Sequence, residues 1–292
     1  MTIPNFQKKM LTWHKKNRRD MPWRRTRDPY KILISEIMLQ QTQVSRVLPK
    51  YGEFLQTFPT IESLAKASDK KLLKVWSGLG YWRRAKYLKE TARVVCGAAK
   101  KTNFENRRRG RAPERSEGRV KRFLKISFSE PHNLEKLPGI GPYTARAIAC
   151  FSFNNSEAFL DTNIRRVYLH FFFPDKKNVS DKEITEIAQK AVWKKNPREW
   201  HYALFDYGAT ELKNKNINKQ SRHYAKQSKF ENSFRSYRTK VVQFLLSRPN
   251  NKASHKEIEK LLLNSPYPSQ KIIDALLKDN LIKKKDSLHF SL

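Results

Sequence analysis

Cysteine and long hydrophobic runs are both scarce in this chain. Cys96 and Cys150 are the only cysteines among 292 residues, so a single chain cannot form a disulfide framework or a metal site with four thiolates. No apolar stretch approaches the roughly 20 residues that a membrane-spanning helix needs. Residues 1–16 are polar and basic and lack the apolar core of a secretory signal, which favours a cytoplasmic location.

Acidic residues are also few. The chain has 27 Asp and Glu against 61 Lys and Arg, a formal net charge of +34 and a pI near 10.2. This charge predicts binding to a polyanion with strong salt dependence, and nucleic acid is the first candidate. A basic membrane-surface protein is the alternative, but the positive charge is spread over the whole length. No membrane partner is therefore expected.

Helical periodicity dominates most of the sequence. With 38% hydrophobic and 12% aromatic residues, the chain can build one core and has enough material for two. Between residues 5 and 230, apolar residues recur at intervals of three and four, with almost no strand-like alternation. The expected fold class is all-α. Helices are predicted over Tyr30–Val44, Ser63–Ser77 and Tyr81–Ala98, with a break at Gly78-Leu79-Gly80.

Two segments depart from that pattern. Residues 100–125 are rich in Arg, Glu and Ser and offer little to bury, so we interpret them as a mobile basic insertion, either a DNA-contacting arm or a solvated loop without a role. After residue 232 the spacing predicts a small winged-helix-like domain with a supporting role. Its predicted elements are helices over Ser236–Leu246, Ser254–Leu263 and Ser269–Lys278 and a hairpin over residues 281–290.

The stretch from Lys136 to Ala145, KLPGIGPYTA, is the most informative motif. Gly139 and Gly141 allow a tight turn between two short helices, and the free amides at the start of the second helix can face a phosphate. Pro and Gly among apolar residues more often mark an ordinary turn. The charge of the chain favours instead a helix-hairpin-helix that holds duplex DNA without recognising its sequence.

Glu36 is a single carboxylate inside the apolar run Ile32–Leu39. A Glu in this setting is usually structural and reaches solvent or an arginine such as Arg24 or Arg84. The apolar neighbours favour another interpretation, because they raise the pKa of a carboxylic acid. Such an acid keeps its proton near neutral pH and can donate it to a poor leaving group.

Asp161 precedes a helix expected to begin near Asn163. It is a natural N-cap, and the same position suits a second role, because helix N-terminal amides favour the ionised carboxylate. An anion at Asp161 can stabilise a cation while Glu36 supplies a proton. Cleavage of a base–sugar bond needs that pair, since the leaving base requires protonation and the sugar acquires oxocarbenium character.

At these residues the chain resembles the helix-hairpin-helix DNA glycosylase superfamily, and within it most closely the A/G-specific adenine DNA glycosylases. The resemblance covers about residues 5–212 apart from the insertion, and rests on Pro29–Val44, Gly78–Ala85 and the hairpin followed by Asp161, in that order. It implies a two-lobed helix-hairpin-helix fold. We expect one lobe from residues 1–28 and 130–232, a helical-bundle lobe from 29–129 that includes the insertion, and the winged-helix-like domain at 233–292.

The resemblance also implies roles for individual residues. Glu36 would protonate a flipped-out adenine, Asp161 would stabilise the sugar cation, and Tyr143 and Asn163 would position these groups. The residues implied to line the base pocket are Trp23, Arg24 and Asp206. Those implied to contact DNA are Leu39, Gln40, Gln41, Thr42, Tyr81, Gly139, Ile140, Gly141 and Thr144. Of these, Gln41 and Tyr81 would enter the base stack beside the extruded nucleotide.

Tyr143 indicates the reaction type. In the related endonuclease III enzymes this position is a lysine that forms a Schiff base and cuts the strand, whereas a phenol cannot form an imine. Tyr143 therefore predicts a monofunctional glycosylase, and the resemblance implies that it removes adenine opposite guanine or 8-oxoguanine. Its expected partner is double-stranded DNA with a mismatched or damaged base pair, and it is expected to act as a monomer associated with the nucleoid.

Two departures from the family pattern bear on cofactor and substrate. Family members usually carry four cysteines that hold an iron–sulfur cluster, at positions near which this chain has Leu212, Lys219, Arg222 and Ser228. We therefore expect no iron–sulfur cluster and no other metal site, apart from a monovalent cation at the hairpin backbone. Without a cluster, the loop that contains these four positions needs another source of order, and packing of the C-terminal domain against it is a candidate. That domain is also too short and too helical to be the Nudix-like domain with which typical adenine glycosylases recognise 8-oxoguanine.

Two alternatives stay open. One is a thymine or uracil mismatch glycosylase acting opposite guanine, since some relatives with that activity also have a tyrosine at the Tyr143 position, although the run Leu39–Gln43 favours adenine. The other is a catalytically silent module that recognises distorted DNA by its shape. The presence of both Glu36 and Asp161 argues against silence.

Overall fold

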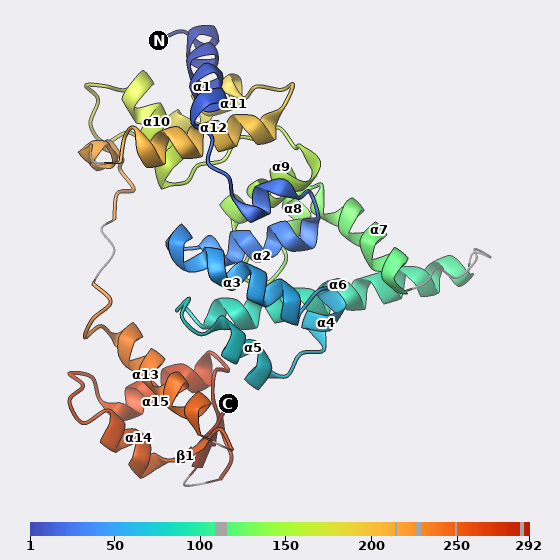
Figure 1. Ribbon diagram of the computed structural model, residues 1–292, viewed down its shortest axis with the longest axis vertical. Coiled ribbons are helices and arrows are strands. Elements are labelled where there is room, and N and C mark those ends of the chain that lie inside the picture. The colour runs from blue at the N-terminus through green and yellow to red at the C-terminus, as the bar shows by residue number, and fades with distance from the viewer. Residues whose placement is uncertain (109–115, 214, 226–228, 249, 287–288) are drawn as a thin grey trace. The chain divides into compact units, whose positions relative to one another are not determined.

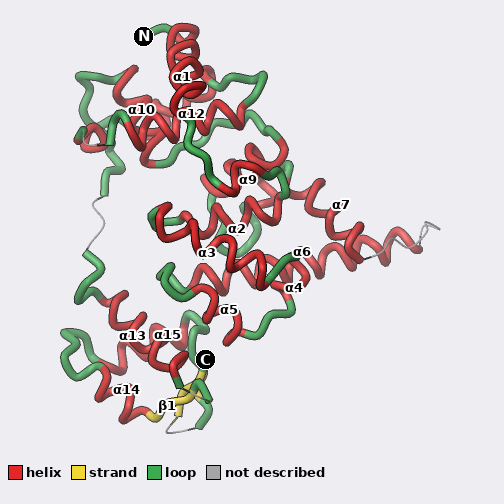
Figure 2. The backbone as a smooth tube through the Cα atoms, in the orientation of Figure 1, coloured by secondary structure: helices red, strands yellow, loops and turns green. Residues whose placement is uncertain are grey.

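The computed structural model describes residues 1–292 except 109–115, 214, 226–228, 249 and 287–288. Helices make up most of the described chain, and a small three-stranded sheet forms near the C-terminus (Figures 1 and 2). The all-α fold class is thus confirmed. The chain divides into two compact units, one of residues 1–36 and 121–226 and the other of residues 37–120 and 227–292.

The first unit has its core where helices α1, α10 and α12 pack together. Phe6 of α1 is fully buried, and its ring lies 5.5 Å from that of Tyr168, 5.0 Å from that of Phe172 and 5.4 Å from that of Trp200. Such clusters of tilted aromatic rings contribute much of the burial in a core. The elements of this unit are α1 (Ile3–Asn17), η1 (Pro22–Arg25), the first part of α2 (Pro29–Leu39), most of α7 (Ser116–Phe128), α8 (Pro131–Leu134), α9 (Pro142–Phe153), α10 (Thr162–Phe172), α11 (Asp181–Ala191), α12 (Pro197–Thr210) and η2 (Asn216–Gln220).

The helices of this unit begin at residues whose side chains accept backbone hydrogen bonds. Asp161 caps α10, Ser180 caps α11 in a reciprocal capping box with Glu183, and Asn196 caps α12. Each cap satisfies an amide group that has no partner within the helix. The polar residues between the apolar segments therefore determine where these helices start.

The second unit has a separate aromatic core. Phe54, Phe58 and Trp76 are buried together, and the ring of Phe54 lies 5.1 Å from that of Phe58 and 6.0 Å from that of Trp76. The helices around this core are α3 (Val44–Thr57), α4 (Ile61–Ala65), α5 (Asp69–Trp76) and α6 (Arg83–Arg108). Positive φ angles at Gly78 and Gly80 confirm the predicted break between α5 and α6.

Residues 233–292 form three helices and an antiparallel sheet. The order along the chain is α13 (Phe234–Ser247), β1 (Lys252–Ser254), α14 (His255–Leu261), α15 (Ser269–Lys278), β2 (Lys283–Lys284) and β3 (His289–Ser291). The strand order in the sheet is β1-β3-β2, with Ala253 and Lys284 both opposite Phe290. This arrangement confirms the winged-helix-like prediction. Strand β1 was not predicted, because its three residues are too few to show strand-like alternation.

Two predicted helices proved to be shorter. The helix expected over residues 30–44 ends at Leu39. Near this end Arg84 donates hydrogen bonds to the backbone carbonyls of Ile37 and Met38, and Gln41 adopts a φ of 54°. The helix expected over residues 63–77 is divided into α4 and α5, because the side chain of Ser68 caps a new helix by accepting from the amide of Lys71.

The interpretation of residues 100–125 as a loop was wrong for its two ends. Helix α6 continues to Arg108, and α7 begins at Ser116; residues 109–115 lie outside the described residues. Helix α7 forms because Val120, Leu124 and Phe128 recur every four residues and are all buried. The high density of arginine around this spacing obscured it in the sequence.

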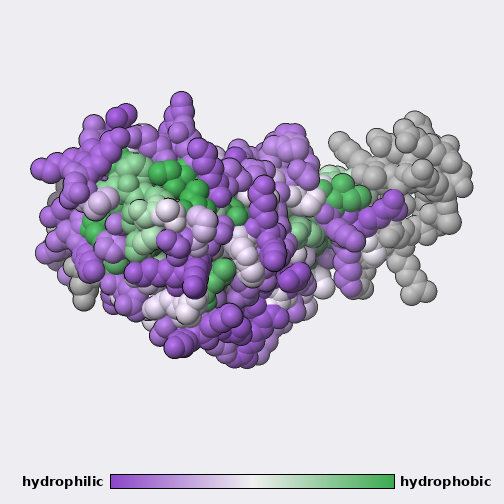
Figure 3. Space-filling model, turned by 90° about the horizontal axis from the view of Figure 1, so that it is seen from above, coloured by the Kyte–Doolittle hydropathy of each residue, from purple (hydrophilic) through white to green (hydrophobic). Residues whose placement is uncertain are grey.

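Hydrophilic residues cover most of the face seen in Figure 3, around a smaller apolar area. Within the described part of the chain, no helix is both long and apolar enough to cross a membrane.

Candidate active site

Glu36 lies on α2 at the end of the first unit and is only 5% exposed. Burial raises the pKa of its carboxyl group to about 8, and the negative charge of Asp161 acts in the same direction, while a hydrogen bond from Tyr143 and the charge of Arg24 lower it. The group therefore holds a proton over much of the neutral range. The expected acid at Glu36 has the environment that its role requires.

Asp161 is fixed as the N-cap of α10. Its Oδ1 accepts from the amide of Ile164 at 2.7 Å, and its Oδ2 accepts from Nδ2 of Asn163 at 2.9 Å. Burial raises the pKa of Asp161 overall, although the bonds from Ile164 and Asn163 lower it, so the capping bonds do not dominate as the sequence indicated. In its ionised form Asp161 raises the pKa of Glu36.

Tyr143, the second residue of α9, connects the hairpin to this pair. Its ring packs edge-on against Phe159 at 5.7 Å, and its hydroxyl is hydrogen-bonded to Glu36. Burial, followed by the charges of Glu36 and Asp161, raises the pKa of the phenol well above its usual value. Tyr143 thus remains a neutral donor that orients the Glu36 carboxyl.

Asn163 is held in place by close contact between α10 and α12. A Cβ atom at Gly208 of α12 would lie 2.8 Å from the carbonyl carbon of Asn163 and closer still to its oxygen, so only glycine permits this approach. Arg166 strengthens the same contact by donating to the Gly208 carbonyl at 2.6 Å. Sequence reasoning missed Gly208, which lies two residues after Asp206.

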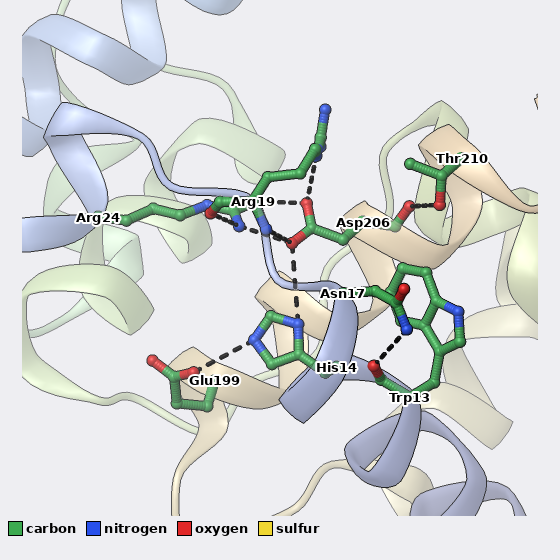
Figure 4. A network of polar contacts seen from close by, with 8 residues as sticks. All are labelled: Trp13, His14, Asn17, Arg19, Arg24, Glu199, Asp206 and Thr210. Atoms are coloured by element: carbon green, nitrogen blue, oxygen red, sulfur yellow. Dashed lines mark hydrogen bonds and ion pairs between the residues drawn. The ribbon is translucent and has the colours of Figure 1, made fainter.

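Asp206 is fully buried at the centre of the ion-pair network in Figure 4. Arg24 donates to its two oxygens at 2.7 and 2.8 Å, and Arg19 donates through Nε at 2.6 Å and through its backbone amide at 3.0 Å. Nδ1 of His14 lies 3.7 Å from Oδ2. Although burial alone would raise it, these arginines hold the pKa of Asp206 below its ordinary value. The carboxylate is already occupied by donors, so it acts on the site by positioning Arg24.

Arg24 and Tyr202 form the side of the site that faces Glu36. The guanidinium of Arg24 lies 4.3 Å from the centre of the Tyr202 ring, and Trp23 beside it is buried. The Tyr202 hydroxyl is buried and has no hydrogen-bond partner among the described residues. Its pKa is raised by burial, and the charge of Glu36 contributes. Sequence reasoning missed Tyr202; its spacing, one helical turn before Asp206 on α12, was the available signal.

The hairpin residues differ in backbone conformation and in exposure. Gly139 has a φ of 74°, which favours glycine, whereas Gly141 is extended and exposed and serves as the N-cap of α9. The side chains of Ile140 and Thr144 are buried. The DNA contact predicted for these two residues is therefore one that their backbone groups would make, as expected of a hairpin that holds phosphates through its amides.

In the second unit, Arg84 joins the two loops that contain the other predicted DNA contacts. Its guanidinium donates to the carbonyls of Ile37 at 2.8 Å and Leu79 at 3.1 Å and to Thr42 Oγ1 at 2.8 Å. It makes further bonds to the carbonyls of Met38, Gln40 and Gly80. One arginine thus connects two loops. The first contains Leu39, Gln40, Gln41 and Thr42, and the second contains Tyr81. Gln41 and Tyr81 have φ angles of 54° and 46°, and Arg84 was not among the predicted site residues.

The residues near the cysteine positions of the family do not suit an iron–sulfur cluster. Leu212 is apolar and buried, Lys219 and Arg222 are cations, and Ser228 lies outside the described residues. Backbone bonds of 2.9 Å from Val179 to Gln220 and from Arg222 to Val179 fix this segment. These bonds give the segment order within the first unit. No group of three or more His, Cys, Asp or Glu in the described part of the chain could hold a metal ion.

Known proteins resemble this chain in both sequence and structure. The model of the HhH-GPD superfamily base excision DNA repair proteins matches residues 34–195. The adenine DNA glycosylase of Buchnera aphidicola subsp. Baizongia pistaciae is 35% identical over 72% of this chain and 53% of its own length. That of Mycolicibacterium smegmatis is 38% identical over 54% of this chain and 46% of its own length, so the chain spans about half the length of these two relatives.

One solved structure, that of a thermostable thymine-DNA glycosylase, matches with a TM-score of 0.55 and 29% identity. The match covers 75% of this chain and 94% of that protein. Unlike the two sequence relatives, this neighbour is similar over nearly its full length.

Proposed function

Because the chain belongs to the HhH-GPD superfamily of base excision DNA repair proteins, we propose that it removes adenine from duplex DNA by hydrolysing the N-glycosidic bond. The observation on which the proposal rests is the pairing of Glu36 with Asp161. Glu36 is a buried acid with a pKa near 8, and Asp161 is a capped anion whose charge reaches it. An acid that can protonate the leaving base, together with a carboxylate that can stabilise the sugar cation, is what glycosidic cleavage requires.

In the proposed reaction Glu36 gives its proton to the flipped-out base. The electron pair of the base–sugar bond leaves with the protonated base, and the sugar becomes an oxocarbenium ion that Asp161 stabilises. Water then adds to the sugar and loses a proton, which can return to Glu36. Asn163 holds Asp161, Tyr143 holds Glu36, and Asp206 holds Arg24, so each reacting group has a positioning partner.

We propose a monofunctional reaction. A Schiff base requires an amine, and the residue in hydrogen-bond contact with Glu36 is a phenol. The product is then an abasic site in an intact strand. The chain is proposed to work as a monomer on duplex DNA with a mismatched or damaged pair, without an iron–sulfur cluster and with a monovalent cation at the hairpin backbone.

Adenine is favoured as the substrate by the names of the two sequence relatives, whereas the structural neighbour is a thymine-DNA glycosylase. Labelled duplexes with adenine opposite 8-oxoguanine, adenine opposite guanine, and thymine or uracil opposite guanine separate these possibilities. Alkali-dependent cleavage at adenine is expected. Cleavage only at thymine or uracil would favour the second substrate, and no cleavage with any duplex would leave a DNA-binding module.

A further inference from the structure

Three consecutive side chains contact the C-terminal domain, the first two from the loop that links α5 to α6 and the third from the first residue of α6. Arg235 donates to the Tyr81 hydroxyl, Nε1 of Trp82 donates to Thr239 Oγ1 at 3.3 Å, and Arg83 pairs with Asp279 at 3.2 Å. All these residues belong to the second unit. We call residues 78–83 the Tyr81 loop.

Tyr81 is itself held by two guanidinium groups. That of Arg84 lies 5.3 Å from the centre of its ring, and that of Arg235 lies 5.1 Å from it. These distances are within the range of cation–π attraction. Tyr81 also has a φ of 46°, a conformation that a tyrosine keeps only when its surroundings impose it.

We propose that Arg235 is a positioning residue through which the C-terminal domain orients Tyr81 for insertion into the base stack of DNA. The inference rests on the proposed function, in which Tyr81 fills the gap left by an extruded nucleotide. An aromatic side chain that is already oriented before DNA binds loses less conformational freedom on insertion. The domain then contributes to opening the duplex without having to contact the target base.

Base unstacking can be measured apart from chemistry. A duplex with 2-aminopurine next to the adenine–guanine mismatch gains fluorescence when the base stack opens, and alkali treatment of the same duplex reports base release. Both are measured with the full chain at saturating protein. The variants are Arg235→Met, which removes the guanidinium, and Arg235→Lys, which restores a cation.

Arg248→Met is the matched control. Arg248 follows α13, pairs with Glu257 and lies 4.6 Å from the centre of the Phe244 ring, so it has the same kinds of contact without touching the Tyr81 loop. Arg235→Met should slow both unstacking and base release roughly tenfold. Arg235→Lys should recover most of the rate, and Arg248→Met should behave as the wild type. In a Tyr81→Ala background, Arg235→Met should have no further effect.

The proposal is overturned if Arg248→Met is as slow as Arg235→Met, if Arg235→Met slows the Tyr81→Ala protein further, or if Arg235→Met unstacks DNA normally or faster. Failure of the proposed function gives a different pattern. In that case the wild type releases no base from any duplex, while unstacking still depends on Arg235. A wild type that neither releases a base nor unstacks the duplex would refute both.

Discussion

Glu36 and Asp161 have the same functional group in different surroundings. Glu36 is 5% exposed on an apolar helix and is hydrogen-bonded to Tyr143, whereas Asp161 accepts two hydrogen bonds at the start of α10. Desolvation favours the neutral form of a carboxyl group, and donors favour its anion. Burial thus raises the pKa of both carboxyl groups, while the donors at the start of α10 act in the opposite direction on Asp161.

Replacing Glu36 with Gln removes the proton but keeps the shape of the side chain. Base release should fall by roughly 10²–10⁴-fold, the usual contribution of a general acid, while the Kd for duplex DNA should stay within about threefold, since binding depends on phosphate contacts. Single-turnover assays and fluorescence anisotropy measure the two quantities. Glu186→Gln, at an exposed position of α11, is the control and should be fully active. Near-normal turnover by Glu36→Gln would remove the proposed mechanism.

The raised pKa of Glu36, about 8 against an ordinary 4.5, also predicts how rate and stability depend on pH. The rate of base release should fall as pH rises through about 8, because the acid loses its proton, and it should fall again at low pH once Asp161 is protonated. Stability should depend on pH for the same reason. The folded state binds the Glu36 proton more tightly than the unfolded state does, so the stabilising effect of this proton is complete below pH 4.5 and is lost as pH rises towards 8. The melting temperature of Glu36→Gln relative to wild type should therefore be higher at pH 8 than at pH 5. A constant difference in thermal melts would contradict the assignment.

At the scale of elements, the contact between α10 and α12 fixes Asn163, which donates a hydrogen bond to Asp161. Gly208→Ala would force a methyl group against the backbone of Asn163, so we expect a loss of stability of about 1–3 kcal/mol and a slower reaction through displacement of Asn163 and Asp161. Gly52→Ala is the matched control, because Gly52 is also helical and an added Cβ would meet nothing within 4 Å. The free energy of unfolding of Gly52→Ala should rise by about 0.5–1 kcal/mol. Denaturant titrations measure the free energy of unfolding of both variants. An equal change in Gly208→Ala and Gly52→Ala would refute the packing argument.

The elements that could be predicted are those whose signals are local. Capping residues and apolar spacing located the helix that Asp161 begins, and glycines located the break before Tyr81. The end of α2 at Leu39 could not be predicted, since Arg84, far along the sequence, accounts for it. The close approach at Gly208 likewise depends on a partner helix. Local chemistry thus predicted the raised pKa of Glu36 and the N-cap at Asp161, whereas the contacts of Arg84 and Gly208 depend on long-range packing.

At the scale of the whole molecule, the chemistry and the predicted wedge residues belong to different units. Glu36, Asp161, Tyr143 and Asn163 lie in the first unit, and the loops with Gln41 and Tyr81 lie in the second, together with the winged-helix-like domain. Helix α2 contributes residues to both. The proposal for Arg235 gives the C-terminal domain a part in opening DNA, which goes beyond the supporting role expected from the sequence.

The net charge of +34 predicts how the whole chain responds to salt. A protein that neutralises about 6–10 phosphates loses roughly 10³–10⁵-fold in affinity between about 50 and 200 mM salt, and we expect a loss of this order. The slope of log K against log salt should be the same for matched and mismatched duplexes, because we expect the hairpin and the basic surface to contact phosphates and not bases. Lys136→Gln, at an exposed position beside the hairpin, should reduce that slope by about one, whereas Lys190→Gln on α11 should leave it unchanged. Anisotropy titrations at several salt concentrations give the slopes. Equal slopes for the two variants would show that the hairpin is not where this chain holds the DNA backbone.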